Sequence, residues 1–382
     1  MKTLTILVLF FFSNLTWAYP NFIGHGYSSC LTCHYNPFGN GPLNDYGRAV
    51  SAAAIASKHF SGNATDEDVA NRSGFFYKKP KNNWFRPGID YRGLYYIRQF
   101  QKENQKEDYI TMDANTSVVI KLGNRDQYLF SGSVGYAPRP HGTDEPEYRS
   151  REYYLGWRAT KGFGIYAGLM DKVYGIRIPD HIAYSRILPQ TTQNDQVHGV
   201  ILHYNQTSFD LGVHAFAGNL TEKENNRPGV EQRGFSTQFE YSLSPQTRLG
   251  FSGMNSNNDY LKVQALATHV RAGFGKGSSI MSEVGYVKKD PDAVNNPTKE
   301  SLYYFLQGHI NLTRGLYFLT TAEYQKEDIS GKSEILRIAP GIQYFPAQRY
   351  EFRMDLYNTK RFSENAATED RWDLALQLHL WY

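Results

Sequence analysis

Cysteine is scarce in this sequence, with only two residues in a chain of 382. A chain of this length can form one large β-domain or two ordinary domains. Two cysteines exclude the disulfide framework that holds small secreted domains together. Long apolar runs are scarce as well, and beyond residue 18 none approaches the roughly 20 residues that a helix needs to cross a bilayer. These absences exclude a disulfide-rich scaffold and a bundle of membrane helices.

An excess of charge of one sign is also lacking. The 41 Lys and Arg against 37 Asp and Glu leave a net charge of +4, and acidic and basic residues are mixed along the whole chain. A nucleic-acid partner would require a basic stripe that neutralises phosphates, so we expect no nucleic acid. Tyrosine and glycine are abundant instead, with 29 and 33 residues, and this composition favours β-structure.

The first 18 residues have the pattern of an export signal. An apolar stretch from Leu4 to Phe12 follows a basic residue, and Thr16 and Ala18 supply the small side chains that a signal peptidase reads. An N-terminal anchor helix is the alternative, but the apolar stretch is too short and Pro20 follows it closely. We therefore exclude residues 1–18 from the fold and expect an exported protein.

Both cysteines fall in one five-residue string, Cys30-Leu31-Thr32-Cys33-His34, which reads C-x-x-C-H, the attachment motif of haem c. Two thiols at this spacing can add to the two vinyl groups of one porphyrin, and His34 then lies beneath the iron as the proximal ligand. A short disulfide and a chance match are the alternatives. Zinc is disfavoured because a structural site needs four ligands and no second C-x-x-C exists. The motif predicts one covalent haem.

Glycine, proline and asparagine flank the motif, which is typical of turns and predicts a loop wrapped around a cofactor. Asn44 or Asp45 is a candidate N-cap for a short, Ala-rich helix that ends near Lys58. We assign residues 19–80 to this haem-binding segment. Aromatic residues available to cover the porphyrin are Phe22, Tyr27, Tyr35 and Phe38.

The ligand on the opposite face of the iron decides between electron transfer and small-molecule binding. Four histidines are candidates: His25 and His59 near the motif, and His309 and His379 if the segment reaches into a barrel. Each of them also has an ordinary role as a solvated loop residue or a polar residue of a lumen. Methionine is a further possibility, and the sequence does not single out one of the six.

From about Gly88 onward the sequence divides into about sixteen segments of about 8–14 residues with β-rich composition and partial alternation. Short turns such as Lys276-Gly277 alternate with longer polar loops such as 219–231, as in outer-membrane barrels. A soluble sandwich or propeller is the alternative, but no blade-length repeat is present. We expect a transmembrane antiparallel β-barrel over residues 88–382. The predicted strands are 88–100, 109–121, 127–137, 149–160, 163–170, 195–205, 207–218, 232–243, 246–254, 260–273, 278–288, 300–312, 315–325, 333–345, 349–358 and 370–382.

Alternation assigns side chains to the lipid face or the lumen, because successive residues of a strand point to opposite sides. In the last strand the lipid face comprises Trp372, Leu374, Leu376, Leu378, Leu380 and Tyr382, against Asp373, Gln377 and His379. A second lipid face runs along Ile110, Met112, Ala114, Thr116, Val118 and Ile120. Candidates for interfacial girdles are the pairs Tyr95-Tyr96, Tyr303-Tyr304, Tyr344-Phe345 and Trp381-Tyr382.

The same reasoning predicts a lumen with charges of both signs, as in water-filled pores. The side chains expected to point inward are Arg92, Arg98, Arg337, Arg353, Asp90, Asp113, Glu351 and Asp355. The long segment 171–194 either folds into the lumen as a constriction or remains a surface loop.

A signal, a C-x-x-C-H motif and a barrel in this order resemble porin-like outer-membrane proteins with an N-terminal single-haem c-type cytochrome segment. The specific part of the resemblance is Gly26-Tyr27-Ser28-Ser29-Cys30-Leu31-Thr32-Cys33-His34 with Pro37, Gly39, Gly41, Leu43, Asn44, Tyr46, Gly47 and Arg48. It implies the outer membrane of a Gram-negative-type bacterium, with the haem segment on the periplasmic side. Multihaem porin–cytochrome conduits are similar in idea, but this chain has one attachment site.

Electron transfer at the cell envelope is the leading hypothesis. One porphyrin cannot bridge a hydrocarbon layer of roughly 30 Å, so a periplasmic electron-transfer protein or a small redox shuttle is the expected partner, besides the lipid bilayer and further copies of the chain. The alternative is a diffusion porin in which the haem segment is a plug, gate or structural element. A haem enzyme such as a peroxidase would need an open distal face and an acid–base residue, and we expect a carrier or channel instead.

Overall fold

The computed structural model describes residues 20–382 except 76–77, 79–81, 125, 138–146, 181, 222–228, 230, 293–296 and 364–365. The predicted signal, residues 1–18, lies outside the described residues.

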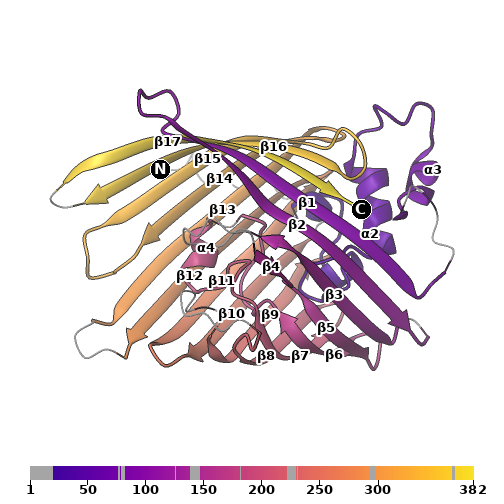
Figure 1. Cartoon of the computed structure of the whole chain (residues 1–382), viewed down its shortest axis with the longest axis horizontal. Coiled ribbons are helices and arrows are strands. Elements are labelled where there is room, and N and C mark those ends of the chain that lie inside the picture. Colours follow the sequence, from indigo (N-terminus) through magenta and orange to yellow (C-terminus); the bar gives the residue numbers. More distant parts are fainter. Residues whose placement is uncertain are drawn as a thin grey trace, which may run out of the picture.

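One antiparallel sheet closes on itself to form a barrel (Figure 1). The first strand, β1 (Phe85–Arg98), pairs with β2 (Lys106–Leu122) on one side and with the last strand, β17 (Ala366–Trp381), on the other. β4 (Glu147–Arg149) and β5 (Tyr153–Arg158) both pair with β3 (Tyr128–Ala137) and form one interrupted strand. The described strands therefore make a sixteen-stranded closed barrel, which confirms the predicted fold class.

Predicted and observed strands agree to within a few residues, except that β16 and β17 extend further toward their shared hairpin. The remaining strands are β6 (Phe163–Met170), β7 (Val197–Asn205), β8 (Phe209–Ala217), β9 (Arg233–Ser244), β10 (Thr247–Asn257), β11 (Leu261–Gly275), β12 (Ser278–Pro291), β13 (Lys299–Thr313), β14 (Leu316–Lys326), β15 (Glu334–Tyr344) and β16 (Tyr350–Ser363). The barrel begins at Phe85, slightly earlier than the predicted boundary at residue 88.

Tight turns join the strands at one end of the barrel, which we call the short-turn end. The turn between β11 and β12 has positive φ at both Lys276 (52°) and Gly277 (89°), as a two-residue hairpin turn requires. Longer connections, such as residues 99–105 and 327–333, lie at the opposite, long-loop end. This asymmetry follows the predicted pattern of turns and loops.

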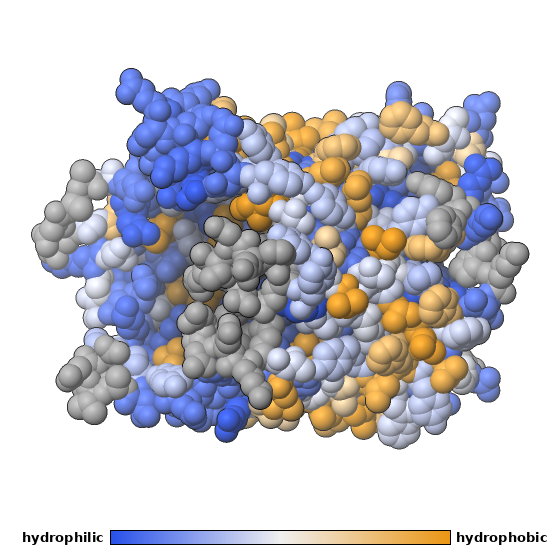
Figure 2. Space-filling view, in the orientation of Figure 1, coloured by the Kyte–Doolittle hydropathy of each residue, from blue (hydrophilic) through white to orange (hydrophobic). Residues whose placement is uncertain are grey.

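Side chains alternate between the outer surface and the interior along the strands. In β11, for example, Leu266 is 64% exposed while Ala265 and Ala267 are buried. Apolar side chains spread over the outer surface of the strands, and hydrophilic side chains gather toward its margins (Figure 2). The period of two therefore gives the wall an apolar outside and a mixed inside.

The predicted lipid face of the second strand is wrong at its beginning. Arg92 pairs with Asp113 and Gly93 pairs with Thr111, so Met112 forms a β-bulge. A bulge adds one residue to one strand and shifts its alternation. Ile110 consequently pairs with Leu94, which packs against a buried cluster on the inner side of the wall. A single inserted residue thus moves Ile110 to the face opposite the predicted one.

The predicted aromatic girdles also need correction. Adjacent residues of a strand point to opposite faces, so at least one member of each pair points inward. Tyr96 donates to Asp373 and Tyr303 donates to Glu283, at 2.8 and 2.7 Å, while Phe345 and Trp381 pack against each other inside the barrel. Tyr382 is not lipid-facing, because its ring lies 4.0 Å from the Arg349 guanidinium and lines an interior cavity.

The interior at the short-turn end is filled by the N-terminal segment. Its helices are α1 (Pro20–Gly24), η1 (Cys30–Thr32), α2 (Asp45–Val50), η2 (Ser51–Ile55) and α3 (Asp66–Asn71), and α2 and α3 are seen at one end of the cylinder in Figure 1. The predicted Ala-rich helix is confirmed as α2 and η2. No helix in the described part of the chain is long and apolar enough to span a membrane.

Residues 171–196 fold into the lumen. Of the two alternatives for the segment 171–194, folding into the lumen is therefore correct and a surface loop is not. The segment includes α4 (Tyr184–Ile187), and many of its side chains are buried, among them Tyr174, Ile178 and Leu188. Tyr174 and Leu188 pack against a cluster from strands β7 to β13. His181 lies outside the described residues.

Candidate functional site

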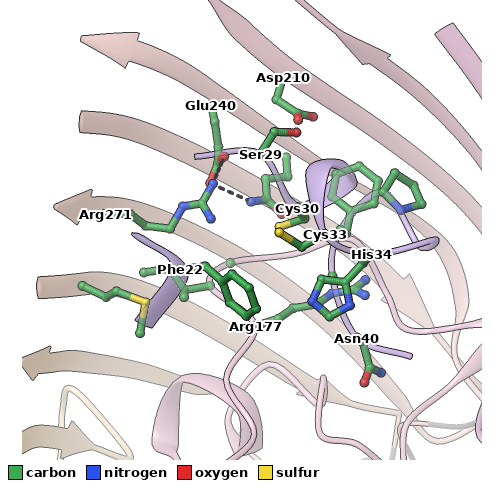
Figure 3. A pocket seen from close by; sticks show the side chains of 17 residues that line it. Phe22, Ser29, Cys30, Cys33, His34, Asn40, Arg177, Asp210, Glu240 and Arg271 are labelled. Carbon is green, nitrogen blue, oxygen red and sulfur yellow. Dashed lines mark hydrogen bonds and ion pairs between the residues drawn. The ribbon is translucent and has the colours of Figure 1, made fainter. Parts of the chain in front are cut away.

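The C-x-x-C-H motif forms one turn of helix. The Cys33 N–H and the His34 N–H both donate to the Cys30 carbonyl, at 3.1 and 2.9 Å. Residues three apart eclipse one another in a 3₁₀ turn, so the two thiols lie on one side of it. Figure 3 shows both sulfur atoms and the His34 ring around the same space.

Asn44 fixes this turn in place. Its main-chain N–H donates to the Cys33 carbonyl at 2.8 Å, and its side-chain amide donates to the Thr32 carbonyl at 3.0 Å. The amide oxygen accepts from the Gly47 N–H at 2.8 Å and so caps α2. Sequence reasoning identified Asn44 only as a possible cap and missed its contacts with the motif. Its hydrogen bonds join the helix start directly to the cysteine turn.

Gly47 explains how the helix approaches the motif so closely. A Cβ atom at this position would lie 2.4 Å from the Cys33 carbonyl oxygen. Only glycine therefore allows α2 to pack against the cysteine turn without moving one of them.

Cys30, Cys33 and His34 all line one cavity, which we call the motif cavity. Its apolar walls come from both the N-terminal segment and the barrel: Phe22, Pro37, Phe38, Ile176 and Met281. Of the four aromatic residues predicted to cover a porphyrin, Phe22 and Phe38 lie here. Tyr27 instead packs edge-on against Tyr46, and Tyr35 is buried beside Phe38 without lining this cavity.

Burial shifts the pKa values of His34 and of both cysteines of the motif. It lowers the pKa of His34 to about 4, although the carbonyls of Gly41 and Asn40 oppose the shift. Burial also raises the pKa of Cys33 to about 12 and that of Cys30 in the same direction. The imidazole is therefore neutral at neutral pH, the form that ligates metals. His34 Nδ1 is buried and makes no hydrogen bond with the described residues.

A buried ionic cluster lies beside Cys30. The guanidinium of Arg271 pairs with the Glu240 carboxylate (Figure 3), and Glu240 also contacts His269 at 2.9 Å and Arg248 at 3.4 Å. Buried charges of this kind are retained where each has a partner. Sequence reasoning missed this cluster because its members come from three separate strands.

A second cavity, which we call the lumen cavity, shares Phe22, His34, Asn40 and Arg177 with the first. It is lined by charges of both signs. Of the side chains predicted to point inward, Asp90, Arg92, Asp113, Glu351, Gln377 and His379 line it, together with Arg151, Glu152, Asp171 and Arg186. Arg337, Arg353 and Asp355 are buried elsewhere inside the barrel, and Arg98 pairs with Asp108 in a half-exposed position.

Arginines from the short-turn end hold the N-terminal segment by its main chain. Arg158 donates to the Tyr35 carbonyl at 2.9 Å, and Arg271 donates to the Ser28 carbonyl at 3.3 Å. Arg314 donates to the Ala56 carbonyl at 2.8 Å. The wall itself also contacts the segment, since the Gly277 N–H donates to the Gly24 carbonyl at 2.7 Å. These contacts fix the position of the motif inside the barrel.

The four histidines proposed as distal ligands lie in different places. His25 is within 3.5 Å of the Tyr317 hydroxyl, and His59 is exposed and packs on Phe60. His309 is buried with Gln307 at 3.2 Å. His379 lines the lumen cavity, but its two ring nitrogens contact Glu351 and Asp90 at 2.9 and 2.8 Å. None of the four lines the motif cavity as the described residues form it.

No protein-family model matches the chain, and no curated protein matches its sequence. Among solved structures, outer-membrane expressed OmpT of Vibrio cholerae is similar to it, with a TM-score of 0.60 and 11% identity over 79% of this chain and 99% of that one. The outer membrane channel DcaP of Acinetobacter baumannii has a TM-score of 0.57 at 11% identity, over 78% of this chain and 97% of the channel. An anion-selective porin from Comamonas acidovorans has a TM-score of 0.57 at 8% identity, over 78% of this chain and 99% of the porin. The fold is therefore that of porin-like outer-membrane barrels.

Proposed function

We propose that this chain is a porin-like c-type cytochrome of the outer membrane, which holds one covalent haem at the short-turn end of its barrel for electron transfer at the cell envelope. The observation that carries this proposal is the convergence of Cys30, Cys33 and His34 on one cavity inside a closed barrel. A covalent haem needs both thiols and the imidazole at one place. The two cysteines of the chain meet this requirement.

The residues of the motif cavity fit haem c in three respects. The helical turn places both thiols on one side, and they are free thiols. Phe22, Phe38 and Ile176 supply apolar surface for a porphyrin. Arg177 and Arg271 line the same cavity, and each has a buried Nε–H that donates to no described residue. These donors suit carboxylate groups at the edge of the macrocycle.

Each residue then has a defined role. Cys30 and Cys33 would tether the group through their Sγ atoms, and His34 would ligate the iron with a neutral imidazole nitrogen. The haem supplies a metal centre that gains and loses one electron. The buried walls keep water from that centre, and burial is one of the features that set the potential of a haem.

The position of the segment in the barrel supports a proposed orientation in the membrane. The N-terminal segment lies at the short-turn end, and short turns face the periplasm in bacterial barrels. We therefore place the haem on the periplasmic side. Since one haem cannot bridge roughly 30 Å of hydrocarbon, a periplasmic electron-transfer protein or a small redox shuttle completes the path. One similar structure is described as a trimer, and we expect copies of this chain to associate as well.

Haem-stained electrophoresis of the purified outer membrane tests this proposal. The full chain is produced in a bacterium that attaches haem to exported cytochromes. The wild-type band should stain, and the variant carrying both Cys30→Ala and Cys33→Ala should not, at equal amounts of folded barrel. Thr32→Ala, an exposed position inside the motif, should retain the stain. A wild-type barrel without stain contradicts the proposal.

The second candidate function is a diffusion channel in which the haem segment is a plug or a structural element. The lumen cavity, with charges of both signs beside the segment, favours it, because water-filled pores have such linings. Planar bilayers distinguish the two functions. A channel function predicts ion conductance that is equal in the wild type and the double cysteine variant. If neither conducts ions, the channel function is excluded.

A further inference from the structure

We propose that Met281 is the distal ligand of the haem iron, opposite His34. This inference rests on the proposed function, because it concerns the iron of the attached haem. It assigns the position that the sequence left open among four histidines and six methionines.

Met281 approaches the motif cavity from a different wall than His34. It lies on β12 and is 2% exposed. It pairs across the sheet with Arg271 and Gln307, both of which are also buried inside the barrel. His34 belongs to the N-terminal segment, which the barrel encloses. One ligand therefore comes from the segment and the other from the wall.

The surroundings of Met281 suit an axial thioether. Met281 belongs to the same buried apolar cluster as Cys33, Phe22 and Ile176. A methionine in such a cluster keeps its sulfur away from water and is flexible enough to adapt to a neighbouring group. Methionine opposite histidine is a known ligand pair of c-type haem and raises its reduction potential.

Three other polar side chains on this cavity, those of Glu240, Asp210 and Asn40, already have partners. Glu240 pairs with Arg271, and Asp210 contacts His203 at 2.9 Å. The Asn40 amide donates to Asp171 at 3.0 Å. If either carboxylate ligated the iron instead, a buried arginine or histidine would lose its partner, which is costly. Among the described residues that line the cavity, the Met281 thioether can ligate iron without breaking a hydrogen bond or an ion pair.

The four candidate histidines are less suited as distal ligands, because their present contacts lie away from the motif cavity. His379 is engaged by two carboxylates in the lumen cavity, and His309 lies beside Gln307. His25 is near Tyr317 and Gly277 at the wall, and His59 is exposed. Each would have to leave these contacts to reach the motif cavity, whereas Met281 already lines it.

Optical and magnetic spectra of the haem-loaded full chain test this assignment. The wild type should be low-spin and six-coordinate, with the weak red absorption band that ferric iron gives with a thioether ligand. Met281→Leu conserves volume, so the barrel should fold. This variant should lose the red band, become high-spin and bind carbon monoxide in the ferrous state. Its reduction potential should fall. Met281→His should restore a low-spin spectrum without the red band.

Met254→Leu is the matched control. Met254 is a buried methionine on the neighbouring part of the wall, in β10, and belongs to a cluster without the motif. Its spectrum should equal that of the wild type. An unchanged spectrum in haem-loaded Met281→Leu overturns the ligand assignment and leaves the proposed function standing. A wild type without attached haem overturns the proposed function and the ligand assignment with it.

Discussion

The guanidinium of Arg271 joins the Glu240 carboxylate on the barrel wall to the main-chain carbonyl of Ser28, just ahead of Cys30. One side chain thus connects a charge buried in the wall to the turn that carries the motif. This connection makes the position of the cysteine turn depend on the barrel, since the helices of the segment are short. The stability of the site should therefore respond to changes in the wall.

Arg271→Gln should loosen the N-terminal segment. The change removes the donor to the Ser28 carbonyl and leaves Glu240 with Arg248, His269 and the side-chain amide of Gln238. Breaking a buried ion pair costs on the order of 3 kcal/mol. We expect faster proteolysis of residues 20–58 in the folded barrel. Equal proteolysis in Arg271→Gln and the exposed control Arg361→Gln would refute the connection.

Gly24→Ala should prevent α1 from docking on the wall. A Cβ atom at Gly24 would lie 2.0 Å from the Gly277 carbonyl carbon, where the Gly277 N–H donates to the Gly24 carbonyl. Such overlap forces backbone shifts that cost about 1–3 kcal/mol. The expected result is a loss of haem attachment or protease resistance in the segment, read from the same gels. Gly253→Ala, whose Cβ would meet nothing closer than 3.6 Å, should behave as the wild type.

Lys172→Met should widen the lumen. Lys172 is buried and donates to the carbonyls of Gln190 and Gly229, at 2.9 and 2.7 Å, and so ties the segment 171–196 to a neighbouring loop. Unpaired buried carbonyls cost about 2 kcal/mol, so the segment should move more freely. Planar-bilayer recordings should show larger and noisier conductance than in the wild type. A trace identical to that of the wild type would mean that this lysine does not hold the constriction.

Lys172 should also give the stability a pH dependence. Burial lowers its pKa from 10.5 to about 8, although Asp195 and Asp171 oppose the shift. The folded chain releases this proton at lower pH than the unfolded chain, so the contribution of Lys172 to stability rises between about pH 8 and 10.5. Urea unfolding at several pH values measures this slope, which should be absent in Lys172→Met. A slope that persists in the variant must come from other groups.

Leu266→Arg should destabilise a barrel that sits in lipid. Leu266 is 64% exposed on the outer face of β11. An arginine at the middle of the lipid face of a barrel costs about 2–4 kcal/mol. Unfolding in vesicles should show this loss, while Lys262→Arg, which keeps the charge of an exposed residue near the long-loop end of the same strand, should be neutral. A neutral Leu266→Arg would argue against a membrane at this face.

Much of the barrel could be predicted because alternation is a local property. Turn residues and the period of two located sixteen strands without knowledge of the closed sheet. The bulge at Met112 could not be predicted, since it is defined only by the pairing of Arg92 and Gly93 with the neighbouring strand. The helix α3 was not predicted. A local signal for its start is nevertheless present, since Thr65 and Asp68 form a capping box.

The candidate site also has one part that could be predicted from the sequence and one part that could not. Cys30, Cys33 and His34 form a motif that can be read along the chain, and the structure brings all three to one cavity. Arg271, Glu240 and Met281 lie far away in sequence and reach that cavity only because the barrel closes around the segment. No local pattern marks them, since buried charges and a methionine on a strand are ordinary features of a lumen.

The mass of the tryptic peptide that contains both cysteines tests the central claim most directly. With the signal removed after Ala18, trypsin should release residues 19–48, ending at Arg48. The account predicts that this peptide, taken from outer-membrane material, carries the mass of one haem and begins at Tyr19. The same peptide found without added mass, with two free thiols or a disulfide, would contradict it.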